Sequence, residues 1–240
     1  MIKFITLMLL HIFDSYNQSK IFNFLKKRGY HKFDIFFDIG AHNGETIKLF
    51  LKNFNIEKIF SFEASPINFK KLIKNASKIE KKYQNVQIII ENLAAGSENK
   101  KIIIKQLNET SSSTINELNS NSKYYKKKSF FMNEDFRNSF LEVETKQIKL
   151  SEYIEKKDLD KIDFLKIDTE GYEHNVLKGL EAKLSIVSLV MFEHHYDDML
   201  KKDYTFRDIH RLLINNNFKQ IYKYKMSFRK TFEYIYEKKL

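Results

Sequence analysis

The chain has 240 residues, of which 42% are hydrophobic and 15% aromatic, enough for one domain with a large core. It contains no cysteine, which excludes disulfides, thiolate zinc sites and cysteine nucleophiles and is consistent with a reducing, cytoplasmic location. A formal net charge of +11 is compatible with a basic binding face, but the lysines are spread along the chain, which favours a lysine-rich solvated surface.

Residues 1–32 are predicted to form an N-terminal helical segment that ends near Gly29. The apolar run at residues 4–10 follows Lys3 but lacks a small-residue cleavage site, so it is a poor signal peptide. It is also too short to span a bilayer. We expect a helix that packs on the domain, with weak contact to a membrane surface as the alternative.

The next stretch combines an apolar strand with a glycine-rich turn. Residues 33–38 end at the carboxylate Asp38, and Gly40 and Gly44 follow. Apolar residues then recur at helical spacing up to Phe54, which predicts a buried strand, a tight turn and an amphipathic helix. Such a unit opens a doubly wound α/β domain, in which the turn after the first strand faces the ligand crevice.

The glycine spacing indicates the kind of ligand. The pattern D-x-G-x-x-x-G has neither the third glycine of the dinucleotide fingerprint nor the lysine of a P-loop, so the turn is a poor cradle for pyrophosphate. A carboxylate beside it suits a cationic ligand. The turn resembles motif I of the class I S-adenosylmethionine-dependent methyltransferases, whose cofactor carries an ammonium and a sulfonium. The residues of this turn predicted to hold the cofactor are Asp38, Gly40, His42, Asn43 and Gly44.

A second acidic residue supports this prediction. Residues 58–63 are predicted as the second strand, which ends at Glu63. In doubly wound folds an acidic residue about 20 positions after the glycine turn accepts hydrogen bonds from ribose hydroxyls. Glu63 is therefore predicted to bind the cofactor ribose. Ser65 as N-cap and Pro66, the only proline of the chain, predict the start of the next helix.

The middle of the chain changes character. A third strand is predicted at residues 86–90, and in its exit loop Asn92 and Leu93 are predicted to meet the adenine of the cofactor. Residues 102–104 read as an extra strand. Residues 108–145 are first rich in serine, threonine and asparagine and then in lysine and aromatic residues. A connection of this length is usually a lid or a binding loop, so we predict a cap insertion that faces the substrate.

The last part of the chain completes the predicted sheet. Strands are predicted at residues 143–149, 162–167, 186–192, 218–225 and 231–236. Asp168 lies directly after the second of these strands, and Glu193, His194 and His195 lie at the tip of the third. The predicted fold is an α/β doubly wound, seven-stranded, mostly parallel sheet that ends in an antiparallel hairpin, and the sequence shows no second domain.

Four segments in one order make the match to a family specific: residues 37–45, 62–66, 112–113 and 162–173. Together they resemble the FkbM family of methyltransferases, over roughly residues 33–236. The last segment, which contains K-I-D-x-E-G-x-E, is far more specific than motif I. The chain departs from the family at His42, where a small residue or asparagine is common, and in its more basic cap; these departures leave the identity of the acceptor open.

The resemblance implies a methyltransferase domain at residues 33–240 with strand order 3-2-1-4-5, so that strands one and four flank the crevice. It also implies S-adenosylmethionine as cofactor and a hydroxyl of a sugar, polysaccharide precursor or related small molecule as acceptor. Methyl transfer to a neutral hydroxyl requires that the hydroxyl lose its proton, to which a positioned base contributes roughly 10²–10⁴-fold. The predicted catalytic residues are Asp168, Glu170 and His194.

Two further features concern the same site. Lys166 lies in the middle of a strand predicted to be buried, and a buried ammonium needs a partner, for which Glu193 at the tip of the neighbouring strand is the candidate. The acidic residues and histidines can also be read as ligands of a divalent cation, but we favour a site without metal.

Three other functions remain as alternatives. A nucleic-acid methyltransferase fits the charge, but the single proline excludes an N/D-P-P-Y loop and the absence of cysteine excludes thiol attack on cytosine, which leaves an RNA 2'-hydroxyl as the nucleic-acid acceptor. A NAD-linked oxidoreductase lacks the glycine fingerprint. A non-catalytic cofactor-binding protein is opposed by the intact set of acidic residues.

Overall fold

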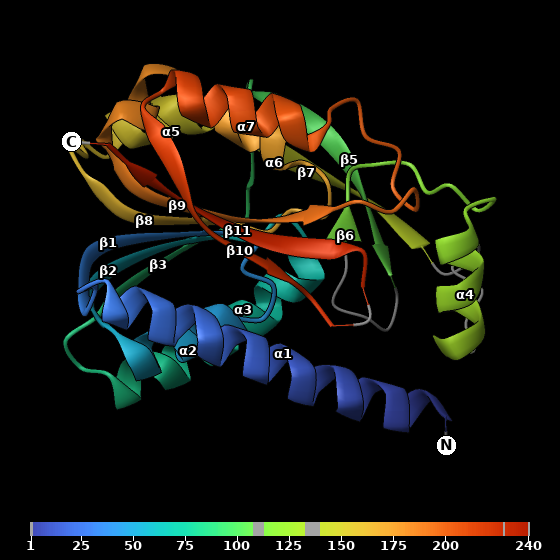
Figure 1. Ribbon diagram of the computed structural model, residues 1–240. Helices are drawn as coiled ribbons and strands as arrows, with labels where there is room; N and C mark the ends of the chain where they lie inside the picture. The colour runs from blue at the N-terminus through green and yellow to red at the C-terminus, as the bar shows by residue number, and fades with distance from the viewer. Residues whose placement is uncertain (1, 108–112, 133–139, 228, 240) are drawn as a thin grey trace.

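The computed structural model describes residues 2–107, 113–132, 140–227 and 229–239 (Figure 1). A seven-stranded sheet forms its centre, in the order β10-β11-β9-β8-β1-β2-β3. The strands in that order are β10 (Phe218–Lys225), β11 (Thr231–Lys238), β9 (Val187–His195), β8 (Ile162–Ile167), β1 (Lys32–Ile39), β2 (Asn55–Phe62) and β3 (Gln87–Glu91). Five of these strands are parallel, and the terminal hairpin β10–β11 joins β9 in antiparallel pairing. The predicted fold and the strand order 3-2-1-4-5 are thereby confirmed.

Helices cover both faces of this sheet (Figure 1). One layer consists of α1 (Ile2–Lys27), α2 (Glu45–Asn53) and α3 (Pro66–Lys82). The other consists of α5 (Leu150–Lys156), α6 (Glu173–Leu180), the 3₁₀ helix η2 (Glu181–Ile186) and α7 (Phe206–Asn215). The start of α3 is as predicted, because the Ser65 side chain accepts a hydrogen bond from the Asn68 N–H and Pro66 begins the helix.

Two hydrophobic cores result from the alternation of side chains along the strands. Phe36 packs with residues of α1 and α2, whereas its neighbour Phe37 packs with residues of α5 and α6. A parallel strand covered on both faces has to be apolar at consecutive positions, which explains the run at residues 35–37. The same alternation determines which polar side chains reach the candidate site.

The N-terminal segment is one continuous helix, α1. Its C-terminal half is part of the core, where Ile21, Phe22 and Leu25 are buried. It ends before Gly29, which has the positive φ of 91° that is common just after a helix. Its first turns extend beyond the sheet towards the helix α4 (Lys123–Met132) (Figure 1). In the part of the chain that the structure describes, no helix is long and apolar enough to cross a membrane.

The middle of the chain builds a second sheet that the sequence did not predict as such. Its order is β4-β7-β5-β6. The strands are β4 (Ala94–Gly96), β5 (Lys100–Leu107), β6 (Ser113–Thr114) and β7 (Phe140–Lys149). The segments predicted as isolated strands at residues 102–104 and 143–149 pair with each other here. Sequence periodicity could not show this, because pairing joins segments far apart in the chain.

The predicted cap at residues 108–145 is described in part. Residues 108–112, which include Ser112 of the family segments, and residues 133–139 lie outside the described residues. The rest consists of β6, α4 and the start of β7. Helix α4 is fixed against the loop after β9, because the Ser122 hydroxyl donates to Asp198 Oδ1 at 2.5 Å and Tyr125 packs on Met199 and Leu200.

Candidate active site

The site lies where β1 and β8 end side by side. Asp38 stands opposite Lys166 in the parallel pairing of these strands, so the loops that follow both strands meet. Gly40 has a φ of 84°, and a Cβ atom there would lie 1.9 Å from the carbonyl oxygen of Asp168. The Asp168 N–H also donates to the carbonyl of Ile39 at 2.9 Å. Only glycine therefore allows these two loops to approach each other.

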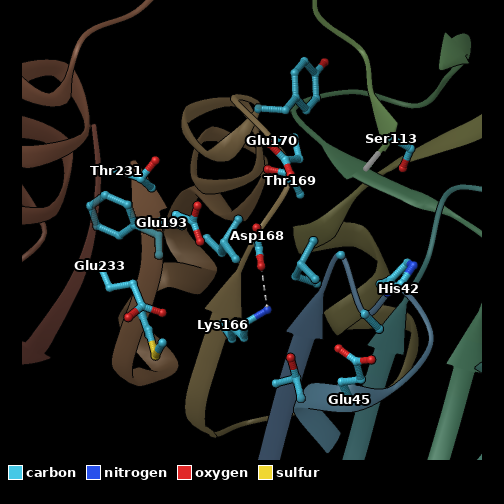
Figure 2. Close-up of a pocket in the computed structure, with 18 of the residues that line it drawn as sticks. His42, Glu45, Ser113, Lys166, Asp168, Thr169, Glu170, Glu193, Thr231 and Glu233 are labelled. Carbon is cyan, nitrogen blue, oxygen red and sulfur yellow. Dashed lines mark hydrogen bonds and ion pairs between the residues drawn. The ribbon is translucent and has the colours of Figure 1, made fainter. Parts of the chain in front are cut away.

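A continuous cavity of about 1640 Å³ runs over the carboxyl ends of the strands. Ligand pockets commonly measure about 300–1,000 Å³, so this one has room for a cofactor and an acceptor together. Four of the predicted cofactor-binding residues line it: Gly40, His42, Glu63 and Leu93. Figure 2 shows His42 on one side of the cavity and Glu193 and Thr231 on the other, with Asp168 between them.

Glu63 is held by main-chain donors. One of its carboxylate oxygens accepts from the His42 N–H at 2.7 Å and the other from the Ser65 N–H at 2.8 Å. Burial raises the pKa of Glu63 to about 7, against the effect of these two hydrogen bonds. A carboxylate has about four acceptor positions, so Glu63 can still accept from hydroxyl groups in the cavity, as its predicted role requires.

Four other predicted cofactor residues do not line the cavity. Asp38 is fully buried, because strand alternation turns its side chain under the layer of α1 and α2. Asn43 accepts from the Glu45 N–H at 3.2 Å, and Gly44 is the N-cap of α2. Asn92 donates to the carbonyl of Glu63 at 2.8 Å. These four residues shape the turns beside the cavity without lining it, and their contact with the cofactor stays a prediction.

Asp38 is instead one partner of a buried ammonium. Lys166 Nζ lies 3.2 Å from Asp168 Oδ2 and 3.6 Å from Asp38 Oδ1 (Figure 2). Burial lowers the pKa of Lys166, but the two carboxylates outweigh it and hold that pKa above its ordinary value. Glu193, the predicted partner, acts on Lys166 only through its charge, which adds to the effect of Asp168 and Asp38. Lys166 stands opposite Met191 in β9, so Glu193 lies further along, at the cavity.

The loop that carries Asp168 is fixed by a residue whose role the sequence did not indicate. Glu173 is buried, and its Oε1 accepts from the N–H groups of Gly171 at 2.9 Å and of Thr169 at 3.2 Å. The Tyr204 hydroxyl donates to its other oxygen. Glu173 lies within the family segment at residues 162–173, which was the available signal.

The second sheet holds the same loop from its other side. The Thr114 hydroxyl donates to the carbonyl of Glu170 at 2.9 Å, and the Asn116 amide donates to the carbonyl of Gly171 at 2.8 Å. Glu170 has a positive φ of 49°, a conformation that is uncommon for a residue with a side chain. The cap therefore positions Glu170, whose side chain lines the cavity.

The structure brings His195 into the cavity and leaves His194 outside it. His194 is buried between the rings of Tyr196, Tyr204 and Phe206, and this burial lowers its pKa to about 3. His194 therefore does not line the cavity, where its predicted role towards the acceptor would require it. Adjacent residues of a strand point to opposite faces, and the sequence did not show which face of β9 is open.

His195 lies among carboxylates. Its Nε2 is 3.2 Å from Glu193 Oε1 and 3.4 Å from Glu170 Oε2. On the other side of the ring, Nδ1 is 3.1 Å from the Thr231 hydroxyl and 3.8 Å from Asp197 Oδ2. Burial lowers the pKa of His195, but the carboxylates raise it to about 10. At neutral pH His195 is therefore a cation.

Acidic side chains dominate this end of the cavity, which is lined by Asp168, Glu170, Glu193 and Glu233 (Figure 2). Burial raises the pKa of Glu193 well above its ordinary value, and Asp168 adds to this effect, whereas His195 opposes it. Such a set of carboxylates can accept hydrogen bonds from the hydroxyl groups of a ligand. Among the described residues, no group of three or more His, Asp or Glu side chains has the geometry to hold a metal ion.

Comparison with known proteins decides the family. The model of the Methyltransferase FkbM domain matches residues 38–224. The chain belongs to the FkbM methyltransferase family. The match confirms the resemblance read from the sequence, and it supports S-adenosylmethionine as the cofactor. No curated protein sequence matches the chain closely enough to be called a relative.

Solved structures share the fold. Methyltransferase FkbM from Methylobacillus flagellatus KT is 14% identical and matches 85% of this chain and 43% of its own, with a TM-score of 0.55. This chain therefore spans less than half of the length of that protein. Magnesium protoporphyrin IX methyltransferase from Synechocystis PCC 6803, in a structure with bound SAM, is 9% identical over 95% of this chain and 81% of its own, with a TM-score of 0.53. A putative RNA methyltransferase from Pyrococcus horikoshii is 13% identical over 94% and 85%, with a TM-score of 0.50.

Proposed function

We propose that this protein is an S-adenosylmethionine-dependent O-methyltransferase that acts on a hydroxyl of a sugar, a polysaccharide precursor or a related small molecule. The observation that carries the proposal is the pair formed by Glu193 and His195 beside Glu170, next to the loop of Asp168. A hydroxyl acceptor needs a proton acceptor and groups that bind its other hydroxyls, and carboxylates do both.

The two ends of the cavity have different chemistry. Gly40, His42, Glu63 and Leu93 line one end and would hold the cofactor, with Glu63 towards its ribose hydroxyls. When bound, S-adenosylmethionine supplies a methyl group activated by a sulfonium. The protein aligns the acceptor oxygen with that carbon, an effect worth about 7–11 kcal/mol in the most favourable cases.

The acceptor proton has to move to a group at the other end. His195 already carries a proton, so it is a poor base. Glu193 is partly buried, with a side chain 16% exposed, and its pKa is raised, which makes its ionised form a stronger base than an exposed carboxylate. In the proposed reaction, Glu193 would take the hydroxyl proton as the acceptor oxygen displaces S-adenosylhomocysteine from the methyl carbon, so that a carbon–oxygen bond replaces the carbon–sulfur bond. His195 keeps its proton and holds the carboxylates of Glu193 and Glu170 in place by charge, and Asp168 and Glu170 accept hydrogen bonds from the acceptor.

Two measurements test this proposal. Calorimetry with S-adenosylmethionine should show stoichiometric binding to the wild-type protein and to Glu193→Gln. Transfer of label from methyl-tritiated S-adenosylmethionine to a panel of free and nucleotide-activated hexoses should yield a methyl ether. In Glu193→Gln the rate should fall roughly 10²-fold or more.

The matched control is Glu144→Gln, which removes an exposed carboxylate that pairs with Lys101 on the second sheet and should leave transfer unchanged. Transfer of the methyl group to nitrogen instead of oxygen would contradict the proposed O-methylation. Full activity of Glu193→Gln would remove Glu193 as the base, and a wild-type protein without affinity for the cofactor would favour a non-catalytic role.

A further inference from the structure

The cavity continues past His195 to a mouth with a different charge. Three lysines line this mouth: Lys123 at the start of α4, and Lys225 and Lys230 beside the β10–β11 turn. All three are exposed. Within the described ranges, none of them has an acidic partner at ion-pair distance. Thr231, next in sequence to Lys230, donates to or accepts from His195 at 3.1 Å, so the mouth adjoins the proposed acceptor end.

The main chain that carries these lysines is held in place. The carbonyl of Lys230 accepts from the Tyr196 N–H at 2.7 Å. Arg229 Nη2 lies 2.8 Å from Asp14 Oδ2 of α1, which fixes the turn against that helix. Lys123 follows Ser122, the residue that fixes α4 through Asp198. The three lysines, which line one cavity, are therefore carried by main chain that is held in place.

Charge is thus separated along the cavity. Its floor carries Glu170, Glu193 and Glu233, whereas Asp14 is the acidic residue that lines the mouth, and it is already paired with Arg229. A cavity with one sign of charge at its entrance raises the local concentration of ligands with the opposite sign. The half-buried ring of Tyr124 also lines the cavity and offers an amphipathic surface for a sugar or a base.

We infer that the acceptor carries a phosphoryl group, which Lys123, Lys225 and Lys230 bind at the mouth while a hydroxyl of the same molecule reaches Glu193. This inference rests on the proposed function, because it assigns the acceptor to the class of phosphorylated small molecules, such as nucleoside-diphosphate sugars. Lysine binds phosphate as a point charge, so three flexible ammonium groups suit a mono- or diphosphate in more than one orientation.

The test uses pyrophosphate as probe on the full chain saturated with S-adenosylhomocysteine. Calorimetry should show binding to the wild-type protein, and Lys225→Ala/Lys230→Ala should weaken it at least tenfold. The matched control is Lys74→Ala/Lys78→Ala, which removes two lysines of α3 that do not line the cavity and should bind pyrophosphate like the wild-type protein. Equal affinity of both double variants, or no binding to the wild-type protein, would overturn the inference.

Further arms separate the sources of phosphate and the two proposals. UDP-glucose should compete with pyrophosphate. Binding to vesicles of phosphatidylglycerol, or to a single-stranded RNA, that depends on Lys225 and Lys230 without any binding of pyrophosphate would assign the lysines to a membrane or to RNA and overturn the inference. Methylation of UDP-glucose at equal kcat/KM by the wild-type and double-variant proteins would overturn the phosphate site but leave the proposed methyltransferase activity intact. Pyrophosphate binding without methyl transfer to any hydroxyl would support the phosphate site but contradict the proposed O-methyltransferase activity.

Discussion

The buried ammonium of Lys166 offers the sharpest test of how the site is held. Lys166→Met keeps most of the side-chain volume and removes the charge between Asp38 and Asp168. Removing one partner of a buried ion pair costs about 3–5 kcal/mol, because the other charge stays buried and unpaired. The side chain of Asp168 is 35% exposed, whereas that of Asp38 is fully buried. The cost therefore falls on Asp38, and we expect about 3 kcal/mol.

For a chain of this size, 3 kcal/mol corresponds to a fall in Tm of about 6–12 °C. Urea unfolding at neutral pH measures the loss directly. Burial already raises the pKa of Asp38, and Lys166 opposes this, so without the ammonium the pKa of Asp38 rises further. Protonated Asp38 needs no partner, and the destabilisation of Lys166→Met should accordingly shrink as the pH falls.

Two variants control this experiment. Asp38→Asn combined with Lys166→Met removes the orphaned charge and should regain part of the lost stability. Lys161→Met removes an exposed lysine that pairs with Asp163 and should change the unfolding free energy by less than about 0.5 kcal/mol. The reasoning would be refuted if Lys166→Met were as stable as the wild-type protein, or if the double variant were no more stable than the single one.

Three other predictions concern titration. Because the pKa of Glu63 rises to about 7 on folding from 4.5, Glu63 binds more protons in the native state than in the unfolded chain between these values. Its contribution to the unfolding free energy should fall by about 3 kcal/mol as the pH rises across that window. The pH dependence of urea unfolding should differ by this amount between the wild-type protein and Glu63→Gln, and an identical pH dependence would contradict the assignment. His195→Gln removes the cation that opposes the raised pKa of Glu193, so the acidic limb of the kcat–pH profile should move up by about one unit. His194→Gln should leave the kcat–pH profile unchanged. It should remove the part of the loss of protein stability between pH 6.5 and 3 that arises because the buried neutral imidazole must gain a proton. Equal kcat–pH profiles for His194→Gln and His195→Gln would contradict the different roles assigned to the two histidines.

Local pattern determined much of this protein in advance. The apolar run before Asp38, the glycine turn and the amphipathic helix after it are encoded within a few residues, as are the Ser65–Pro66 helix start and the terminal hairpin. Each depends on side-chain spacing and on backbone preferences that neighbours in sequence set. The family segments have the same local character, and the matched domain confirms them.

The tertiary structure decided what depends on the face of a strand and on pairing across the sheet. His194 and His195 differ by one position, yet the rings of Tyr196, Tyr204 and Phe206 bury the first, and the second is left to the cavity. Lys166 meets Asp38 because β8 lies beside β1 in one register, a contact between segments far apart in the chain. Spacing along a sequence fixes the alternation of side chains, but which side becomes the site is set by the elements that cover the other one.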